Sequence, residues 1–373
     1  MERLGESLRE SGKLRGMSGT SEPLAPSLDQ RVITATTGAL ELFGIYLGDR
    51  LGLYRALRSG PATVQELAER ADIAPRYAQE WLEQQAVAGV LTVDDVSADA
   101  QARRYDLPGD HAGVVCDPTA LDYVAPLARL VVGIASALDE VAAAYRSGEG
   151  VPFASYGADL RGGQGAINRP VFSSALVDEW LPALGPIVER LTTGGRVADV
   201  ACGLGWSTMA VARAFPHADV LGIDNDAASI QEALAVADKE GLQVRFECTD
   251  ASSLTRAGPF DVVLLLEALH DLARPVDVLA SIRSALADGG ALLLADEAVA
   301  PTFTAPGDEL ERMMYGWSIT HCLPASMAEQ PSAAIGTVLR EQTVRELAQE
   351  AGFRSVAVLD VDGGFFRLYA VRP

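Results

Sequence analysis

Two glycines and a downstream aspartate carry the clearest chemistry in this sequence. The segment 199–206 reads DVACGLGW, and it places Gly203 and Gly205 where an apolar run gives way to a helical pattern. Glycine at such a turn lets the backbone approach a ligand closely. Asp224 ends the next apolar run, and a carboxylate at a strand end can accept hydrogen bonds from both hydroxyls of a ribose. The spacing therefore predicts a nucleoside-binding loop.

The same segment excludes two common nucleotide sites. Its spacing, DxxCGxG, differs from the GxGxxG of dinucleotide-binding folds. No Lys or Arg follows the glycines to meet a phosphate, which excludes a P-loop. The expected ligand therefore has a ribose and no pyrophosphate.

His270 is the first candidate for proton transfer. It follows a predicted strand at 262–266, and ligands bind at the carboxyl ends of strands in α/β sheets. Histidine titrates in the range that a general base for a hydroxyl group requires. Capping of the next helix, or a hydrogen bond beneath the ligand, explains the residue equally well. Glu267 is a second candidate base or a ligand contact, and Asp271 either orients His270 or caps a helix.

A second histidine lies on a candidate substrate wall. Met313, Trp317 and His321 are spaced so that one helical face carries all three. Such a face could line a pocket for an aromatic substrate and make His321 a rival catalytic residue. Core packing or a subunit interface accounts for the same face. Cys202 is interpreted as a small buried filler and not a nucleophile, and no cluster has convincing metal-ligand spacing.

The second half of the chain alternates between strand and helix patterns, which indicates crossover units and a parallel sheet. The last two runs are separated too tightly for a helical crossover and predict an antiparallel hairpin at the sheet edge. The predicted strands are 197–202, 220–223, 244–247, 262–266, 291–295, 355–360 and 365–371, and the predicted helices are 208–214, 228–240 and 275–286.

Residues 31–107 predict a winged helix, formed by a long helix, helices at 64–70 and 76–88, and strands at 90–93 and 104–107, with Thr63 as an N-cap. The second short helix carries Glu80 and Glu83 and only one arginine, Arg76, which is unlike a helix that enters a DNA groove. Subunit pairing or walling of a pocket is the preferred role. Residues 119–190 predict mostly helix, interrupted by a polar, glycine-rich stretch at 156–165.

Composition narrows the function classes. The chain has 373 residues with a formal net charge of −21, which argues against a nucleic-acid binder. Four scattered cysteines form no disulfide framework and fit a reducing cytoplasm. No apolar run approaches the roughly 18 residues of a membrane span. We interpret residues 1–30 as a mobile leader, 31–115 as a winged-helix dimerisation domain, 116–190 as a helical linker and pocket cap, and 191–373 as the catalytic domain.

The segment 191–373 resembles the class I S-adenosylmethionine-dependent methyltransferases. The resemblance rests on Asp199, Gly203 and Gly205, on Asp224, on the Thr249-Asp250-Ala251 segment, on Glu267–Asp271, and on the turn at 287–290. Ala201 departs from the family, where many members have glycine. The resemblance implies a Rossmann-like seven-stranded sheet and S-adenosyl-L-methionine as the cofactor. It implies cofactor contacts by Asp199, Ala201, Gly203, Gly205, Asp224, Asn225, Asp250, Ala251 and Glu267.

With its winged helix, the whole chain resembles bacterial small-molecule O-methyltransferases of natural-product type. That resemblance implies a homodimer that methylates a small molecule, most often at oxygen, with His270 as base. It implies substrate contacts by Tyr156, Asn168, Met313, Trp317 and His321. Two alternatives remain at this point. One is a cofactor-binding relative that catalyses cyclisation, hydroxylation or decarboxylation, and the other is a ligand-sensing DNA-binding regulator.

Overall fold

The computed structural model describes residues 27–373, so most of the predicted leader at 1–30 lies outside the described residues. Residues 27–30 are the exception: Ser27 is the N-cap of helix α2 (Leu28–Arg50), and residues 28–30 belong to its first turn. The chain divides between residues 112 and 113 into two compact units, which are described separately. In the described part of the chain, no helix is long and apolar enough to cross a bilayer.

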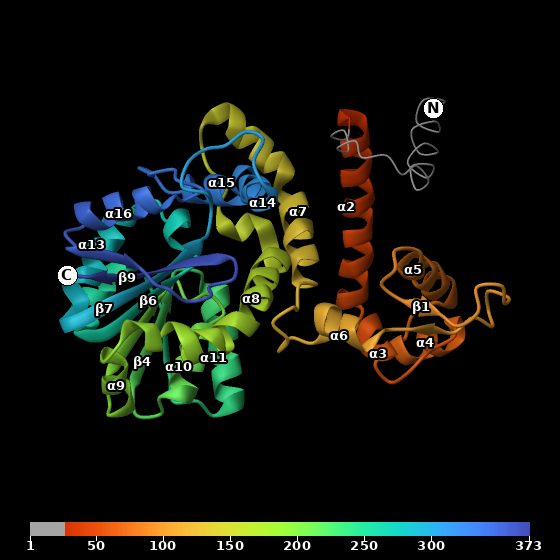
Figure 1. The fold of residues 1–373 in the computed structure, drawn as a ribbon, viewed down its shortest axis with the longest axis horizontal. Coiled ribbons are helices and arrows are strands. Elements are labelled where there is room, and N and C mark those ends of the chain that lie inside the picture. Colours follow the sequence, from red (N-terminus) through yellow and green to blue (C-terminus); the bar gives the residue numbers. More distant parts are fainter. Residues whose placement is uncertain (1–26) are drawn as a thin grey trace, which may run out of the picture. The chain divides into compact units, whose positions relative to one another are not determined.

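The first unit is the predicted winged helix. Helix α2 is followed by α3 (Leu53–Leu57), α4 (Val64–Ala71) and α5 (Pro75–Val87), and then by the antiparallel pair β1 (Thr92–Val93) and β2 (Tyr105–Asp106) (Figure 1). The Thr63 side chain accepts from the Glu66 N–H while the Glu66 carboxylate accepts from the Thr63 N–H. This reciprocal capping box fixes the start of α4 where the sequence predicts it.

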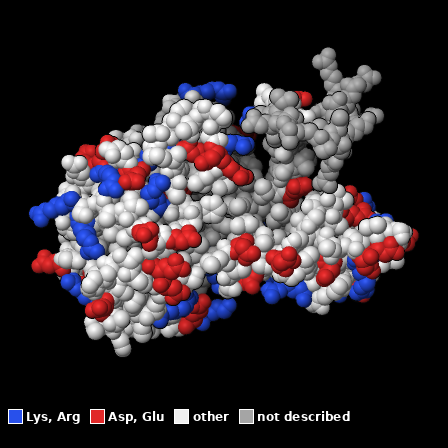
Figure 2. Space-filling view, in the orientation of Figure 1, with Lys and Arg blue, Asp and Glu red and all other residues white. Residues whose placement is uncertain are grey.

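Helix α5 is the helix that would enter a DNA groove in a winged-helix regulator. Its charged side chains mostly form ion pairs with side chains of opposite charge. Arg76 forms an ion pair with Glu80 one turn on, and Glu83 pairs with Arg103 at 3.4 Å. Its buried face packs within the unit, where Trp81 Nε1 donates to the Gly44 carbonyl at 2.9 Å. On the face of the molecule in view, acidic and basic side chains are interspersed (Figure 2).

The second unit is built on a seven-stranded sheet with the order β5-β4-β3-β6-β7-β9-β8. Strands β3 to β7 pair in parallel. Strand β9 is antiparallel to both of its neighbours, as the predicted terminal hairpin requires. The strands are β3 (Arg196–Val200), β4 (Asp219–Asp224), β5 (Arg245–Cys248), β6 (Phe260–Leu266), β7 (Leu286–Glu297), β8 (Ser355–Val358) and β9 (Phe366–Arg372).

Helices cover both faces of this sheet and bury its alternating apolar side chains (Figure 1). On one face Leu279 and Val344 pack into the core, and on the other Leu191 and Val211 do so. The helices are α9 (Ile187–Thr192), α10 (Trp206–Ala214), α11 (Ala227–Glu240), α12 (Leu254–Ala257), α13 (Pro275–Ala285), α14 (Glu309–Trp317), α15 (Leu323–Ser326) and α16 (Glu341–Glu350). The turn predicted at 287–290 lies inside β7, with Gly289 at φ +73°.

The prediction that residues 156–165 interrupt the helical region is wrong. After α6 (Gly109–Cys116), helix α7 (Pro126–Ser147) and the short 3-10 helix η2 (Phe153–Tyr156), the glycine-rich stretch forms the first half of helix α8 (Gly157–Ser173). A Cβ on Gly163 would lie 3.1 Å from backbone atoms of α7, and one on Gly133 of α7 would lie 2.6 Å from the Leu160 nitrogen. These glycines therefore permit close packing of α7 on α8 and do not break the helix.

Candidate active site

The glycine loop joins β3 to α10, where the sequence predicts it. Gly203 and Gly205 have φ of +51° and +73°, a left-handed backbone that glycine adopts without strain. Asp199 lies beneath the loop, and its carboxylate accepts hydrogen bonds from Ser207 Oγ and Thr208 Oγ1, both at 2.6 Å. Burial raises the pKa of Asp199 to about 6. This carboxylate therefore holds the first turn of α10 against the loop.

Asp224 lies at the carboxyl end of β4, next to the glycine loop. Its two carboxylate oxygens accept from the Gly203 and Asp226 backbone N–H groups, both at 2.8 Å. Burial raises the pKa of this carboxyl. A carboxylate offers about four acceptor positions, so two remain for a ligand. A Cβ built on Gly203 would meet no atom within 4 Å, so open space adjoins these acceptors. The residues present thus fit a ribose.

The other predicted cofactor residues follow neighbouring strands. Asn225 is exposed just after Asp224, and Asp250 caps a short turn by accepting from the Ser252 N–H at 2.7 Å. Ala251 is buried beside it. Ala201 has φ +55°, a left-handed conformation that favours glycine.

A cavity of about 120 Å³ lies beside the carboxyl ends of β6 and β7. Helices α7, α8 and α14 supply most of its wall, which is largely apolar and includes Leu127, Leu130, Ile134, Met313 and Trp317. Its polar groups include Asn168, Glu267, His270, Glu297 and His321. Apolar walls with a few convergent polar groups are typical of small-molecule sites.

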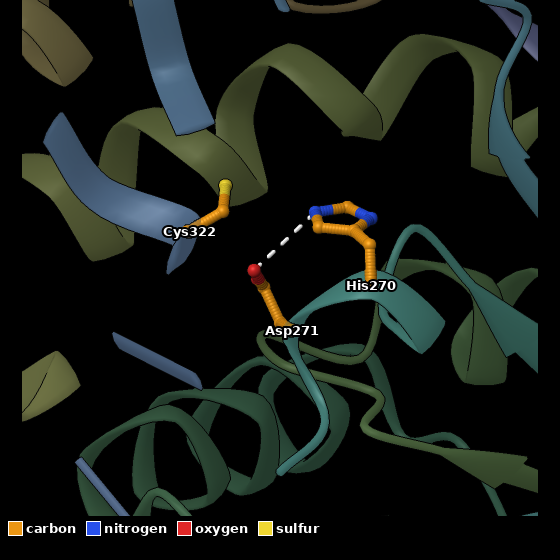
Figure 3. Close-up of side chains that lie close together, drawn as sticks. All are labelled: His270, Asp271 and Cys322. Atoms are coloured by element: carbon orange, nitrogen blue, oxygen red, sulfur yellow. Dashed lines mark ion pairs between the residues drawn. The ribbon is translucent and has the colours of Figure 1, made fainter. Parts of the chain in front are cut away.

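His270 is fully enclosed by protein and lies among three carboxylates. Its Nδ1 lies 3.0 Å from Asp296 Oδ1 and 3.2 Å from Glu297 Oε2, and its Nε2 lies 3.3 Å from Asp271 Oδ1. Figure 3 shows the last of these pairs, with Cys322 facing it from the neighbouring helical segment. Burial by itself would lower the pKa of His270, but the charges of Glu297, Asp296 and Asp271 outweigh it and hold that pKa well above its usual value. The carboxylates therefore favour the protonated, imidazolium form of His270.

Glu267 begins the turn after β6 and also lines the cavity. Its side chain accepts a hydrogen bond from Asn168 Nδ2, which reaches it from α8. Burial raises the pKa of Glu267 to about 7, although the Asn168 hydrogen bond and the charge of His270 oppose that shift. Its backbone has φ +52°, a conformation that costs a non-glycine residue about 1–3 kcal/mol.

The three residues that the helical spacing placed on one face do line the same cavity. Met313 and Trp317 lie on α14, and His321 lies on the wide helical turn η7 (Ser318–Cys322) that continues it; all three line the cavity. Burial lowers the pKa of His321, which keeps the ring neutral. Tyr156 does not line the cavity; its ring packs edge-on against His321 with centroids 4.6 Å apart.

Two acidic residues of the site were absent from the sequence-based prediction. Asp296 and Glu297 end β7, and they lie next to His270 because β7 pairs with β6. The signal was present, since an apolar run that ends in two carboxylates is the pattern that identified Asp224. Burial raises the pKa of Glu297 well above its usual value, whereas His270 holds that of Asp296 below it.

Two sets of these side chains bring possible metal-ligand atoms together. One set is His270, Asp296 and Glu297, and the other is His270, Asp271 and Cys322; within each set the atoms lie within 4.8 Å of one another. Burial raises the pKa of Cys322 to about 12, which disfavours the thiolate that binds metal. Burial also raises the pKa of Cys202 and keeps that thiol protonated.

Comparison with known proteins assigns domains to both units. Residues 191–352 match the family model described as a methyltransferase domain, and residues 38–116 match an Rv2258c-like winged HTH domain. The family model thus covers the glycine loop, Asp224 and the His270 cluster.

Relatives agree with these domains. The N,N-dimethyltransferase OxyT of Streptomyces rimosus is 26% identical over 95% of this chain and 100% of its own length. The ubiquinone biosynthesis O-methyltransferase of Roseobacter denitrificans is 37% identical over 98 residues, which are 26% of this chain and 39% of that protein. The chain thus spans about two fifths of the length of that relative.

A solved structure shares the fold. The mitomycin 7-O-methyltransferase MmcR superposes with a TM-score of 0.60 at 21% identity, over 92% of this chain and 97% of its own. At that level of identity the likeness shows the fold, and it does not show the substrate. The likeness extends over residues of both units of this chain.

Proposed function

We propose that this chain, which belongs to the S-adenosylmethionine-dependent methyltransferases by its methyltransferase and winged-helix domains, methylates a small molecule of natural-product type at oxygen. The observation that carries the proposal is the apolar cavity with a buried histidine–carboxylate cluster beside the carboxyl ends of β6 and β7. The cofactor is S-adenosylmethionine, which solved structures of this fold contain.

The glycine loop and Asp224 would hold the nucleoside end of the cofactor. Asp224 has acceptor positions left for the two ribose hydroxyls, and Gly203 leaves space beside them. Asp250 and Ala251 follow the adjacent strand β5, where they can contact the adenine, and Ala201, Gly205 and Asn225 complete the edge. Asp199 supports the loop from below.

His270 is the proposed general base. The bound cofactor supplies a methyl group already activated by the positive sulfur. The chain must hold the acceptor oxygen in line with that group, exclude water and remove the hydroxyl proton as the oxygen–carbon bond forms. His270 lines the cavity and has Asp296 behind it to stabilise the imidazolium that results. Because the carboxylates raise the pKa of His270, the neutral ring that this role requires is favoured at higher pH.

Residues 116–190 are proposed as the pocket cap. Leu127, Leu130 and Ile134 of α7 and Asn168 of α8 line the cavity wall opposite the strand ends. Tyr156 fixes this wall, because its hydroxyl donates to the Thr320 carbonyl at 3.1 Å next to His321. Met313, Trp317 and His321 are the proposed substrate contacts on the other side, with His321 the alternative base.

The test is transfer of an isotope-labelled methyl group. Pure protein is incubated with methyl-labelled S-adenosylmethionine and a panel of phenols, and labelled product is identified by mass spectrometry. Labelled oxygen-methyl product supports the proposal. Consumption or chemical change of a panel member without label would instead establish the alternative of a non-methylating reaction.

Nitrogen is the second candidate for the methylated atom. The relative that matches nearly the whole chain is named an N,N-dimethyltransferase. Adding aryl amines to the same panel decides between the two, because the position of the label shows which atom reacted.

We also propose that the protein forms a homodimer, in which the two copies pair through their first units. Helix α2 leaves a row of apolar side chains exposed to water, among them Val32, Leu40, Phe43 and Leu47. Exposed apolar surface of this kind is typical of interaction sites.

A further inference from the structure

Resting on the proposed methyl transfer, we propose that the substrate carries a protonated amine and that the Glu267 carboxylate binds it. This assigns a chemical class to the substrate, which the methyltransferase domain by itself does not. The proposal rests on the charges that line the cavity and on the conformation of Glu267.

The titratable groups on the cavity wall suit a cationic ligand better than an anionic one. Among the described residues that line the cavity there is no Lys or Arg. The one strongly basic group is His270, and Asp296 matches its charge at 3.0 Å. Among the described residues Glu267 forms no ion pair: its side chain bonds the neutral amide of Asn168, and although the charge of His270 favours the carboxylate, burial still raises the pKa of Glu267 to about 7. A buried carboxylate is costly unless a cation accompanies it.

A second carboxyl group on the wall, Glu297, has an oxygen that accepts no hydrogen bond, although its raised pKa favours the neutral acid. Glu297 Oε2 is buried without a hydrogen bond, although it lies 3.2 Å from the ring nitrogen of His270. Glu297 is 6% exposed and lines the same cavity as Glu267. An ammonium group offers three donors and no acceptor, so it complements this excess of acceptors.

The backbone at Glu267 points to a role for its side chain. With φ +52°, the position lies in the left-handed region that favours glycine. A glycine would remove the strain but also the carboxylate. Strain of this kind persists where the surrounding structure holds it, and such positions cluster at ligand sites. Since Glu267 lines the cavity, its carboxylate is available to a ligand.

The rest of the wall defines the body of the substrate. Leu127, Leu130, Ile134 and Trp317 offer only apolar surface apart from the indole nitrogen, and these side chains suit an aromatic or hydrocarbon skeleton. The substrate class is therefore an apolar skeleton that bears an amine. Carboxylates and phosphates are disfavoured, because they would face Glu267 without a cation.

The experiment compares three probes of similar size and different charge: benzylamine, benzyl alcohol and benzoate. Binding to the full chain is measured by calorimetry at neutral pH with saturating S-adenosylhomocysteine, which prevents turnover. We expect benzylamine to bind about tenfold more tightly than benzyl alcohol, and benzoate most weakly. Glu267→Gln should bring benzylamine to within about twofold of benzyl alcohol, and Glu309→Gln, which removes an exposed charge from α14, should change nothing.

The wild-type series by itself can overturn the inference, even if the variant does not fold. Equal binding of the three probes, preference for benzoate, or no binding up to about 10 mM contradicts it. An unchanged benzylamine preference in Glu267→Gln, with weakened S-adenosylmethionine but not S-adenosylhomocysteine, would assign Glu267 to the positive sulfur instead. Failure of the proposed function looks different: neither cofactor form binds the wild-type protein, while the probe series can still be measured.

Discussion

At the scale of residues, carboxylates decide the properties of this site. Asp224 has acceptor positions left beside open space, and three other carboxylates surround His270. Asp224, Asp296 and Glu297 lie at strand ends, and Asp271 lies in the short turn that follows β6. The charge state of each group, however, depends on neighbours from other strands.

Asp224→Asn should weaken binding of S-adenosylhomocysteine. Removing a carboxylate that accepts hydrogen bonds costs about 1.5–3 kcal/mol, or roughly ten- to a hundredfold in affinity. Isothermal titration calorimetry measures it. Asp238→Asn on the exposed surface of α11 is the matched control and should bind normally. Equal affinity in the two variants would contradict the assignment of the ribose site.

The pH profile should report the protonation of His270. The neutral ring is the base, and nearby carboxylates raise its pKa, so turnover of a hydroxyl substrate should rise with pH through a midpoint above the usual 6.5. His270→Gln should lower kcat by about 10²–10⁴-fold and remove this rising limb. Initial rates across pH measure both. A variant that keeps full activity and the same profile would transfer the role to Glu267 or His321.

At the scale of elements, the closeness of α7 and α8 shapes the cavity. Gly133 and Gly163 let the two helices approach until one backbone lies against the other. Because the helices are close, Asn168 of α8 can donate to Glu267, and the apolar side chains of α7 line the cavity beside the strand ends. The glycine-rich sequence of residues 156–165 predicted a break in the helix. The sequence alone does not show that these glycines pack against α7.

Gly133→Ala should destabilise the second unit. The added Cβ would lie 2.6 Å from the Leu160 nitrogen, which is backbone and cannot move aside, so we expect a loss of about 1–3 kcal/mol. Gly316→Ala is the matched control, because this helical glycine meets no atom within 4 Å; it should stabilise by about 0.5–1 kcal/mol. Urea unfolding followed by circular dichroism compares them. The same sign for both variants would contradict the packing argument.

At the scale of the whole molecule, two properties follow from what the chain buries and what it exposes. The cavity and the glycine loop of the proposed methyl-transfer site both lie within residues 113–373. The first unit exposes the apolar residues of α2. Metal content and subunit number are therefore the properties to measure on the full chain.

Leu47→Glu should shift a dimer to monomers. The residue is 47% exposed on α2, and a carboxylate buried in an apolar interface without a partner costs several kcal/mol. Sedimentation velocity at micromolar protein measures the mass. Lys239→Gln, on the other unit, is the control, because it changes the net charge by the same amount. A wild-type monomer would contradict the proposed pairing.

Removal of metal should leave methyl transfer unchanged. Asp296 pairs with His270, and the raised pKa of Glu297 favours its neutral acid, so the side chains next to the ring Nδ1 do not need an ion to offset their charge. The measurement is the initial rate after dialysis against EDTA, and again after adding Mg²⁺ or Zn²⁺. Loss of activity that a metal restores would show that His270, Asp296 and Glu297 hold an ion.

Sequence by itself determined the alternation of strands and helices, the winged helix, the glycine loop and Asp224. These features are local: apolar periodicity, a capping residue and a turn glycine act within a few neighbouring residues. Only the tertiary structure decided that Asp296 and Glu297 lie beside His270, that the glycines of α8 pack against a helix, and that Glu267 meets the neutral amide of Asn168. Charge balance and close packing depend on residues far apart in the chain, which meet only when β6, β7 and the helices above them assemble.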